Sequence, residues 1–241
     1  MKKRIWELDA FRGICVLGMV AVHLIYDLVD LYRIVDWQYP EWFSFIKNWG
    51  GVLFLLISGI SATLGSRSVR RGLIVLLCGM VVTVATYGMY HFGMSGKGII
   101  IYFGVLQCLA FCMILWPLFK KLPWWALGIC GVAMVALGFW LKTQPPVDVY
   151  YWMPFGLPWK GFVSSDYFPL FPYLGFFLLG GLLGKTVYAR KESLLPMVHE
   201  GNFLLRFLRF TGRHSLEVYL LHQPILSGVC MLLMNTVGAG H

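Results

Sequence analysis

Four ionisable residues lie on one side of the first apolar segment of the chain. Arg12 and His23 are eleven residues apart, which at about 100° per residue places them about 20° apart around a helix. Asp27 and Asp30 follow His23 by four and seven residues. A carboxylate one turn from an imidazole fixes its tautomer and prepares it to accept a proton. The pattern predicts a general base at His23 that Asp27 orients, with a purely structural His–Asp pair as the alternative.

A second polar line follows the last apolar segment, in the sequence GRHSLEVYLLHQP. Three residues share one helical face through spacings of four and seven: Ser215, Tyr219 and His222. Arg213 and His214 precede them, and Arg213 is expected to neutralise Glu217 at four residues' distance. Pro224 removes a backbone hydrogen bond and is expected to free a carbonyl group. Hydrogen bonding between helices explains Ser215 and Tyr219 as well as a functional role does.

Asp166 opens a third segment of interest, ahead of an apolar stretch over residues 167–184. Its carboxylate is predicted either to cap that helix or to contact a substrate. Pro169 and Pro172 suit the first turn of the same helix. The preceding loop, residues 142–166, is rich in proline and aromatic residues. Such a loop forms either a lid or a belt at the membrane interface.

These residues must be positioned by membrane helices, because the composition excludes a water-soluble globule. The chain has 241 residues, of which 59% are hydrophobic and 13% charged, against about 25% charged residues in soluble domains. Its apolar runs are continuous rather than alternating, which favours helices over a barrel. We predict an all-α, polytopic helical bundle that forms a single membrane-embedded domain over residues 1–241. The seven predicted spans are residues 13–31, 49–64, 72–90, 98–119, 124–141, 167–184 and 216–237.

The distribution of positive charge predicts the orientation. With the N-terminus inside, 15 of the 20 Lys and Arg residues fall on the inner side, as the positive-inside rule requires. The net charge of +9 therefore reflects cytoplasmic loops, and nucleic acid is not expected as a partner. The basic start and first apolar run are interpreted as a retained helix rather than a cleaved signal.

Two further features complete the expected organisation. Residues 202–210, NFLLRFLRF, combine arginines with Phe and Leu and predict a short amphipathic helix on the cytoplasmic membrane surface. All six cysteines fall in predicted spans without a CxxC pair, so we expect reduced packing residues and no metal site.

Four motifs in order resemble a known family. They are ELDAFRGICVLGMVAVHLIYDL, FLLISGISATL, SDYFPLFPYLGFFLLGGLLG and GRHSLEVYLLHQP. Together they look like bacterial members of the heparan-α-glucosaminide N-acetyltransferase catalytic-domain-like family, within the wider group of transmembrane acyltransferases. In that group an Arg near the inner end of the first helix and a His about three turns later are the signature pair, which correspond to Arg12 and His23. The lysosomal enzyme of the family differs at the position of His23 and has more spans.

The resemblance implies a membrane acyltransferase that moves an acyl group, usually acetyl, from cytoplasmic acyl-CoA to a sugar or glycan on the other side. Acetyl-CoA would be the co-substrate, without a metal, and the location a bacterial cytoplasmic (inner) membrane. The catalytic residues are then predicted to be His23 and Asp27. Donor binding is assigned to Arg12, Arg213, His214 and Ser215. Acceptor binding is assigned to Asp30, Asp166, Tyr219, His222 and Gln223.

Two other classes of function remain open at this point. A proton-coupled transporter would use His23, Asp27 and Asp30 as a relay, although the chain has no evident internal repeat. A b-type cytochrome would use His23 and His222 as axial ligands. Assembly as a homo-oligomer is compatible with either class and with the acyltransferase.

Overall fold

The computed structural model describes residues 5–93, 96–195 and 202–238, apart from the side chains of residues 48 and 235–238. The described residues form helices and no β-strand, which confirms the all-α prediction. In chain order the elements are α1 (Trp6–Tyr26), the π-helix η1 (Asp27–Leu31), α2 (Glu41–Leu64), α3 (Ser68–His91), the 3₁₀-helix η2 (Lys97–Ile99), α4 (Val105–Phe119), α5 (Trp124–Lys142), the 3₁₀-helix η3 (Tyr150–Phe155), α6 (Leu170–Thr186), α7 (Phe203–Arg213) and α8 (Ser215–Gly238).

Among the described residues, five helical segments are long and apolar enough to cross a membrane. They are Trp6–Leu31, Glu41–Leu64, Ser68–His91, Trp124–Lys142 and Ser215–Met234. The apolar helices α4 and α6 have 15 and 17 residues, or about 22 and 25 Å, against a hydrocarbon layer of about 30 Å. The chain is therefore an integral, multi-pass membrane protein. The count of seven spans and the cytoplasmic N-terminus stay predictions, and the basic residues Lys2, Lys3 and Arg4 lie outside the described part.

The helix α4 begins seven residues later than the span predicted from residue 98, because the segment before it is extended. Phe103 forms an isolated bridge with Tyr167, and its carbonyl oxygen accepts a hydrogen bond from Phe168 N at 2.9 Å. Ser164 Oγ donates to the carbonyl oxygen of Ile100 at 2.8 Å. Ile100 and Phe103 are buried, so this non-helical backbone lies within protein, where its polar groups find partners.

The helices divide between two compact units, which we describe separately. The terminal unit comprises Met1–Phe54 and Ser193–His241, and the central unit comprises Leu55–Glu192. The helix α2 contributes its first part to the terminal unit and the remainder to the central unit. The prediction of one domain over the whole chain stays a prediction.

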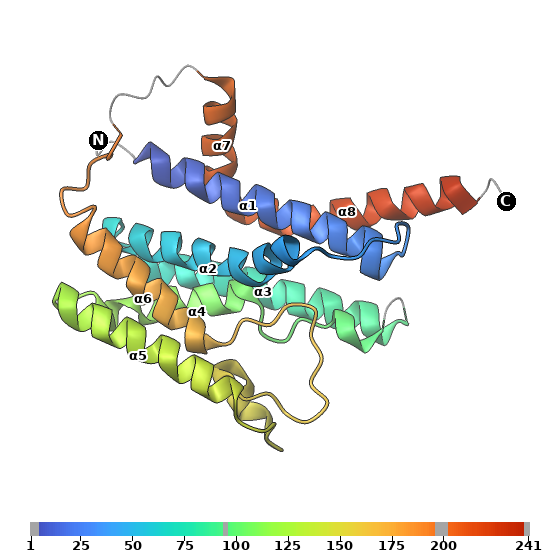
Figure 1. The fold of residues 1–241 in the computed structure, drawn as a ribbon, viewed down its shortest axis with the longest axis horizontal. Helices are drawn as coiled ribbons and strands as arrows, with labels where there is room; N and C mark the ends of the chain where they lie inside the picture. The colour runs from blue at the N-terminus through green and yellow to red at the C-terminus, as the bar shows by residue number, and fades with distance from the viewer. Residues whose placement is uncertain (1–4, 94–95, 196–201, 239–241) are drawn as a thin grey trace. The chain divides into compact units, whose positions relative to one another are not determined.

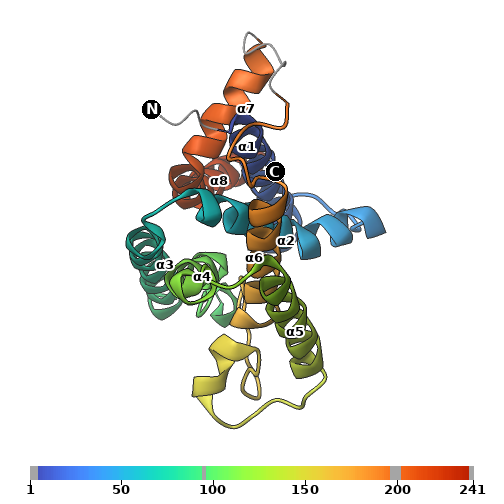
Figure 2. The ribbon, with the colours of Figure 1, turned by 90° about the vertical axis from the view of Figure 1, so that its left-hand side faces the viewer.

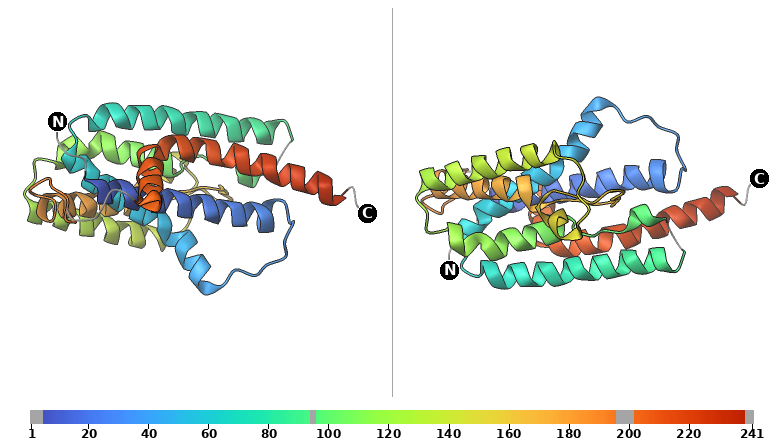
Figure 3. Two further views of the ribbon diagram at one scale, coloured as in Figure 1. Left: turned by 90° about the horizontal axis from the view of Figure 1, so that it is seen from above. Right: turned by 90° about the horizontal axis from the view of Figure 1, so that it is seen from below.

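In the terminal unit α8 packs along α1, and the short α7 crosses α1 (Figures 1 and 3). The crossing depends on two glycines. A Cβ atom at Gly13 would collide with the carbonyl oxygen of Leu208, and one at Gly212 would collide with the carbonyl oxygen of Asp9. The backbones of the two helices therefore touch, as small residues permit in membrane proteins.

In the central unit α3 lies beside α4, and α5 lies beside α6 (Figure 2). Close approach also joins the second part of α2 to α6. A Cβ atom at Gly59 would meet the carbonyl oxygen of Phe177, and one at Gly180 would meet that of Leu56. Gln107 adds a polar link, because its Nε2 donates to the carbonyl oxygen of Gly79 at 2.9 Å.

The amphipathic helix predicted at residues 202–210 is confirmed as α7. Asn202 caps it, since its side-chain oxygen accepts from Leu204 N at 3.0 Å. The helix has 11 residues, about 16 Å, and is too short to cross a bilayer. It exposes a row of apolar side chains: Phe203, Leu204, Phe207 and Phe210. That face suits a membrane interface, and its location on the cytoplasmic side stays a prediction.

Candidate active site

Two histidines from different helices lie in contact in the terminal unit. His23 is near the end of α1 and His222 is in the second turn of α8. Their ring centroids are 4.9 Å apart, at an interplanar angle of 50°. His222 is 8% exposed and His23 is partly buried. The two polar lines predicted from the sequence therefore meet at these rings.

Each imidazole is fixed through the same nitrogen. His23 Nδ1 lies 3.0 Å from the carbonyl oxygen of Met19, and His222 Nδ1 lies 2.5 Å from that of Tyr219. A carbonyl oxygen only accepts hydrogen bonds, so each Nδ1 carries the proton and each neutral ring presents Nε2 as a proton acceptor. The Nε2 atom of His222 is buried without a hydrogen-bond partner among the described residues. This unpaired nitrogen belongs to the ring that lies against His23.

Asp27 pairs with α8 rather than with His23. The Gln223 amide Nε2 lies 2.9 Å from both carboxylate oxygens of Asp27, whose side chain is 0% exposed. Among the described residues no hydrogen bond joins Asp27 to His23. The predicted orientation of His23 by Asp27 is therefore wrong in its geometry, because the backbone carbonyl of Met19 already engages Nδ1. Asp27 instead fastens the end of α1 to α8, beside the two histidines.

The straight polar stripe predicted along the first helix ends at Asp27. A π-helix begins there, and its wider turn changes the angle between successive residues. Asp27 is consequently buried while Asp30 is exposed, so these two carboxylates do not share one face. Single-turn π-helices occur often at functional sites, which fits the position of this one.

Asp30 and its surroundings include two residues that sequence reasoning missed. The Tyr39 hydroxyl donates to Asp30 Oδ2 at 2.6 Å. Burial, and then this bond, raise the pKa of Tyr39, so the hydroxyl keeps its proton. The Lys47 ammonium lies 5.1 Å from the ring centroid of Tyr26 and 5.3 Å from that of Tyr39, within cation–π range. Neither Tyr39 nor Lys47 belongs to a periodic polar pattern, so spacing alone gave no signal for them.

The predicted donor-binding residues lie at the α7–α8 junction and near the start of α1. Arg213 Nε lies 3.3 Å from Asp9 Oδ2, so the expected pairing of Arg213 with Glu217 is wrong. His214, 3.7 Å away, is the group that faces the Glu217 carboxylate. The spacing of four residues does not bring Arg213 and Glu217 together, because they belong to different helices. Arg213 is the last residue of α7, and Glu217 lies in α8, which starts at Ser215. Arg12 is partly buried in α1.

Asp166 lies in the central unit and caps a helix other than the expected one. Its Oδ2 accepts from Val105 N at 3.0 Å, at the N-terminus of α4 rather than of α6. The same turn is capped by Gln107, whose Oε1 accepts from Gly104 N at 3.0 Å. The extended pairing of Phe103 with Tyr167 brings Asp166 to this helix end, which the sequence order could not indicate.

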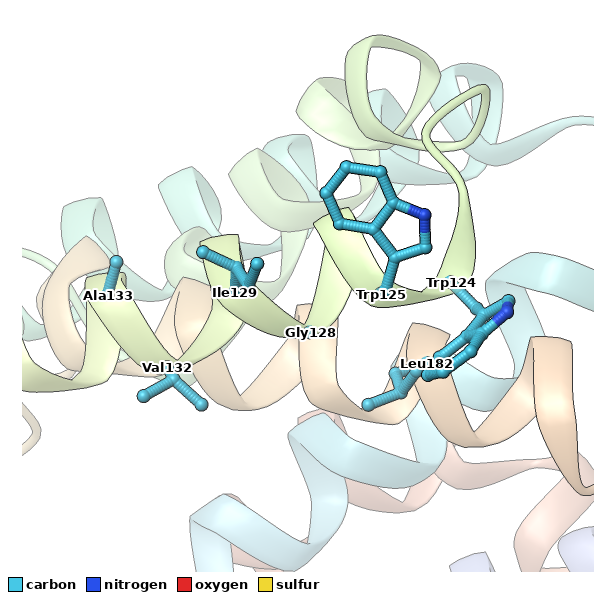
Figure 4. A pocket seen from close by; sticks show the side chains of 7 residues that line it. All are labelled: Trp124, Trp125, Gly128, Ile129, Val132, Ala133 and Leu182. Atoms are coloured by element: carbon cyan, nitrogen blue, oxygen red, sulfur yellow. The ribbon is translucent and has the colours of Figure 1, made fainter.

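One hollow on the central unit lacks side chains that could perform acid–base chemistry. It has a volume of about 510 Å³ and lies on the surface of α5, where apolar side chains and two tryptophans line it (Figure 4). Its lining residues carry no ionisable group: Trp124, Trp125, Gly128, Ile129, Val132, Ala133 and Leu182. Such a surface suits acyl chains of lipid.

The comparison with protein families decides the class. A family model described as "Heparan-alpha-glucosaminide N-acetyltransferase, catalytic" matches residues 4–224. The chain belongs to this family. Searches of curated proteins and of solved structures gave no match.

Membership of the heparan-alpha-glucosaminide N-acetyltransferase catalytic family identifies a membrane transferase and confirms the resemblance seen in the sequence. It favours acyl transfer over a transporter or a cytochrome. The match includes both polar helices of the terminal unit, α1 and the part of α8 up to Pro224. Among the described residues no group of three or more His, Cys, Asp or Glu side chains is arranged to hold a metal ion, and the six cysteines are free thiols.

Proposed function

We propose that the protein transfers an acetyl group from cytoplasmic acetyl-CoA to a hydroxyl or amino group of a sugar or glycan on the opposite side of the membrane. The observation that carries this proposal is the His23–His222 pair, in which both Nδ1 atoms are occupied by carbonyl oxygens and both Nε2 atoms can accept a proton. A base fixed in one tautomer inside a membrane transferase suits deprotonation of an acceptor.

His23 is the proposed general base. Its Nε2 takes the proton from the acceptor as the acceptor's oxygen or nitrogen bonds to the thioester carbonyl carbon. The tetrahedral intermediate then collapses, the carbon–sulfur bond breaks, and the proton passes from His23 to the CoA thiolate. A positioned base of this kind contributes roughly 10²–10⁴ in rate.

The neighbouring residues have distinct proposed roles. His222 lies against His23 and contacts the acceptor together with Tyr219, whose ring centroid is 5.4 Å from that of His222. Asp27 and Gln223 position the two helices, since the amide of Gln223 spans both carboxylate oxygens. Gln223 also keeps its predicted contact with the acceptor.

The remaining predicted contacts stay part of the proposal. On the acceptor side we keep Asp30, which Tyr39 holds, and Asp166. On the donor side we keep Arg12, Arg213, His214 and Ser215.

The proposal is tested with purified protein in sealed vesicles of mixed orientation. Labelled acetyl-CoA is supplied outside, and candidate glycans are enclosed in the lumen or added outside. We expect label on the lumenal glycan and stoichiometric release of CoA thiol. Acetyl-CoA binding without transfer to any hydroxyl or amine on a broad glycan panel would contradict the proposal.

A further inference from the structure

A second hollow in the central unit is lined by four lysines. It lies where the C-terminal ends of α4 and α6 meet that of α2, and its volume is about 420 Å³, within the roughly 300–1,000 Å³ typical of ligand pockets. The lysines are Lys120, Lys121, Lys185 and Lys191, and no Asp or Glu is among the lining residues. We call this hollow the lysine pocket.

One of these lysines has a structural task that the geometry explains. Lys185 Nζ donates to the carbonyl oxygens of Lys120, at 2.7 Å, and Leu122, at 2.5 Å. The first carbonyl group belongs to the C-cap of α4 and the second to the turn that follows it, where unpaired acceptors and the helix dipole favour a cation. Lys185 therefore satisfies these carbonyl groups without help from the other lysines.

The other three lysines have no such task. Lys120, Lys121 and Lys191 are exposed, and no carboxylate within the described ranges forms an ion pair with them. A fifth cation lies close by, because a Cβ atom placed on the lining residue Gly65 would come within 3.2 Å of Arg71 Nη1. The pocket is thus surrounded by positive charge that the protein leaves uncompensated.

The sequence segments around the pocket carry mainly positive charge, as the lining residues do. Residues 62–71, 116–124 and 182–192 contain eight basic residues and one acidic residue, Glu192. The basic residues are Arg67, Arg70, Arg71, Lys120, Lys121, Lys185, Arg190 and Lys191. The positive-inside rule explains an excess of Lys and Arg at the ends of membrane helices, but it does not require these residues to line a hollow of ligand size. A multiply charged anion would fit the hollow and neutralise the positive charge around it.

We propose that the lysine pocket binds clustered phosphate groups, and that these belong to the adenosine 3′,5′-bisphosphate end of the acyl-CoA donor. This assignment rests on the proposed function for the identity of the donor. The alternative basic side chains at the α7–α8 junction already lie next to carboxylates, Arg213 next to Asp9 and His214 next to Glu217. The lysine pocket is therefore the less neutralised of the two basic sites and the stronger for a polyanion.

Binding of adenosine 3′,5′-bisphosphate alone tests the proposal without any acyl transfer. Titration calorimetry compares the full-length protein with the variant K120Q/K121Q/K191Q. The matched control K97Q/K142Q/K160Q removes the same charge from lysines outside the pocket. We expect the dissociation constant to rise about tenfold or more in the first variant and to stay within about twofold in the control. Thermal unfolding of each variant verifies that it is folded.

The remaining outcomes separate the possible sources of the phosphate. If Arg213→Gln weakens binding and the lysine variant does not, the phosphates bind at the α7–α8 junction and the proposal is overturned. If the nucleotide does not bind and the lysine variant instead loses anionic phospholipid detected by mass spectrometry, the assignment to the acyl donor is wrong. Lysine-dependent nucleotide binding in a protein without transferase activity would support the pocket and contradict the proposed function alone.

Discussion

Replacing Gln223 with leucine removes the amide that donates to both oxygens of the buried Asp27 carboxylate, at 2.9 Å each. Hydrogen bonds to a charged group contribute about 1.5–3 kcal/mol in soluble proteins. Between membrane helices the average is about 0.6 kcal/mol and the maximum about 1.7, because separated helices find other partners in the bilayer. The two bonds here and the complete burial of Asp27 put this pair in the upper part of that range. We predict a coupling free energy of about 1–2 kcal/mol.

A double-mutant cycle measures that coupling. The free energy of unfolding is determined in mixed micelles for the wild type, Gln223→Leu, Asp27→Leu and the double variant. Each single variant leaves one buried polar group unsatisfied, whereas the double variant leaves an apolar pair. The double variant should therefore be more stable than the sum of the two single effects predicts. Additivity within about 0.3 kcal/mol would refute the inference that this pair fastens α1 to α8.

Three other predictions concern single side chains. Gly212→Ala should destabilise the protein by about 1–3 kcal/mol, because the added Cβ collides with α1 at the α1–α7 crossing. The control Gly228→Ala, whose Cβ meets nothing within 4 Å, should be neutral or stabilising by up to about 1 kcal/mol. Equal unfolding midpoints for the two variants would contradict the close approach at Gly212. Asp166→Ala should cost about 1 kcal/mol of unfolding free energy by removing the acceptor for Val105 N, and no loss would show that the cap is dispensable. Tyr39→Phe should raise the KM for the acceptor roughly three- to tenfold by releasing its carboxylate partner with kcat retained, whereas an unchanged KM would argue against acceptor binding there.

The sequence predicted the features that depend on one segment alone. Continuous apolar runs and scarce charge were sufficient for the all-α membrane class. The mixture of arginines with Phe and Leu was sufficient for α7. Spacing placed His23 and His222 on defined helical faces. Each of these features is a property of one helix, read at a period of 3.6 residues.

What the sequence did not predict depends on contacts between segments or on a change of helical geometry. The partner of Asp27 is Gln223, which lies 196 residues further along the chain. Helical periodicity does not indicate which residues of distant segments come into contact. The π-helix at Asp27–Leu31 breaks the angle of about 100° per residue that an α-helix assumes. Asp166 caps α4 because two extended segments pair next to it. The lysine pocket likewise forms only where three helix ends meet.

In the proposed mechanism, His23 Nε2 accepts the proton of the acceptor during acetyl transfer. It is tested most directly by the rate of transfer from labelled acetyl-CoA in His23→Gln, with His91→Gln as the matched control at the end of α3. Glutamine retains a polar side chain but does not act as a base in this range of pH. We predict a rate about 10²–10⁴ lower for His23→Gln and an unchanged rate for the control. A rate for His23→Gln within about twofold of the wild type would contradict it.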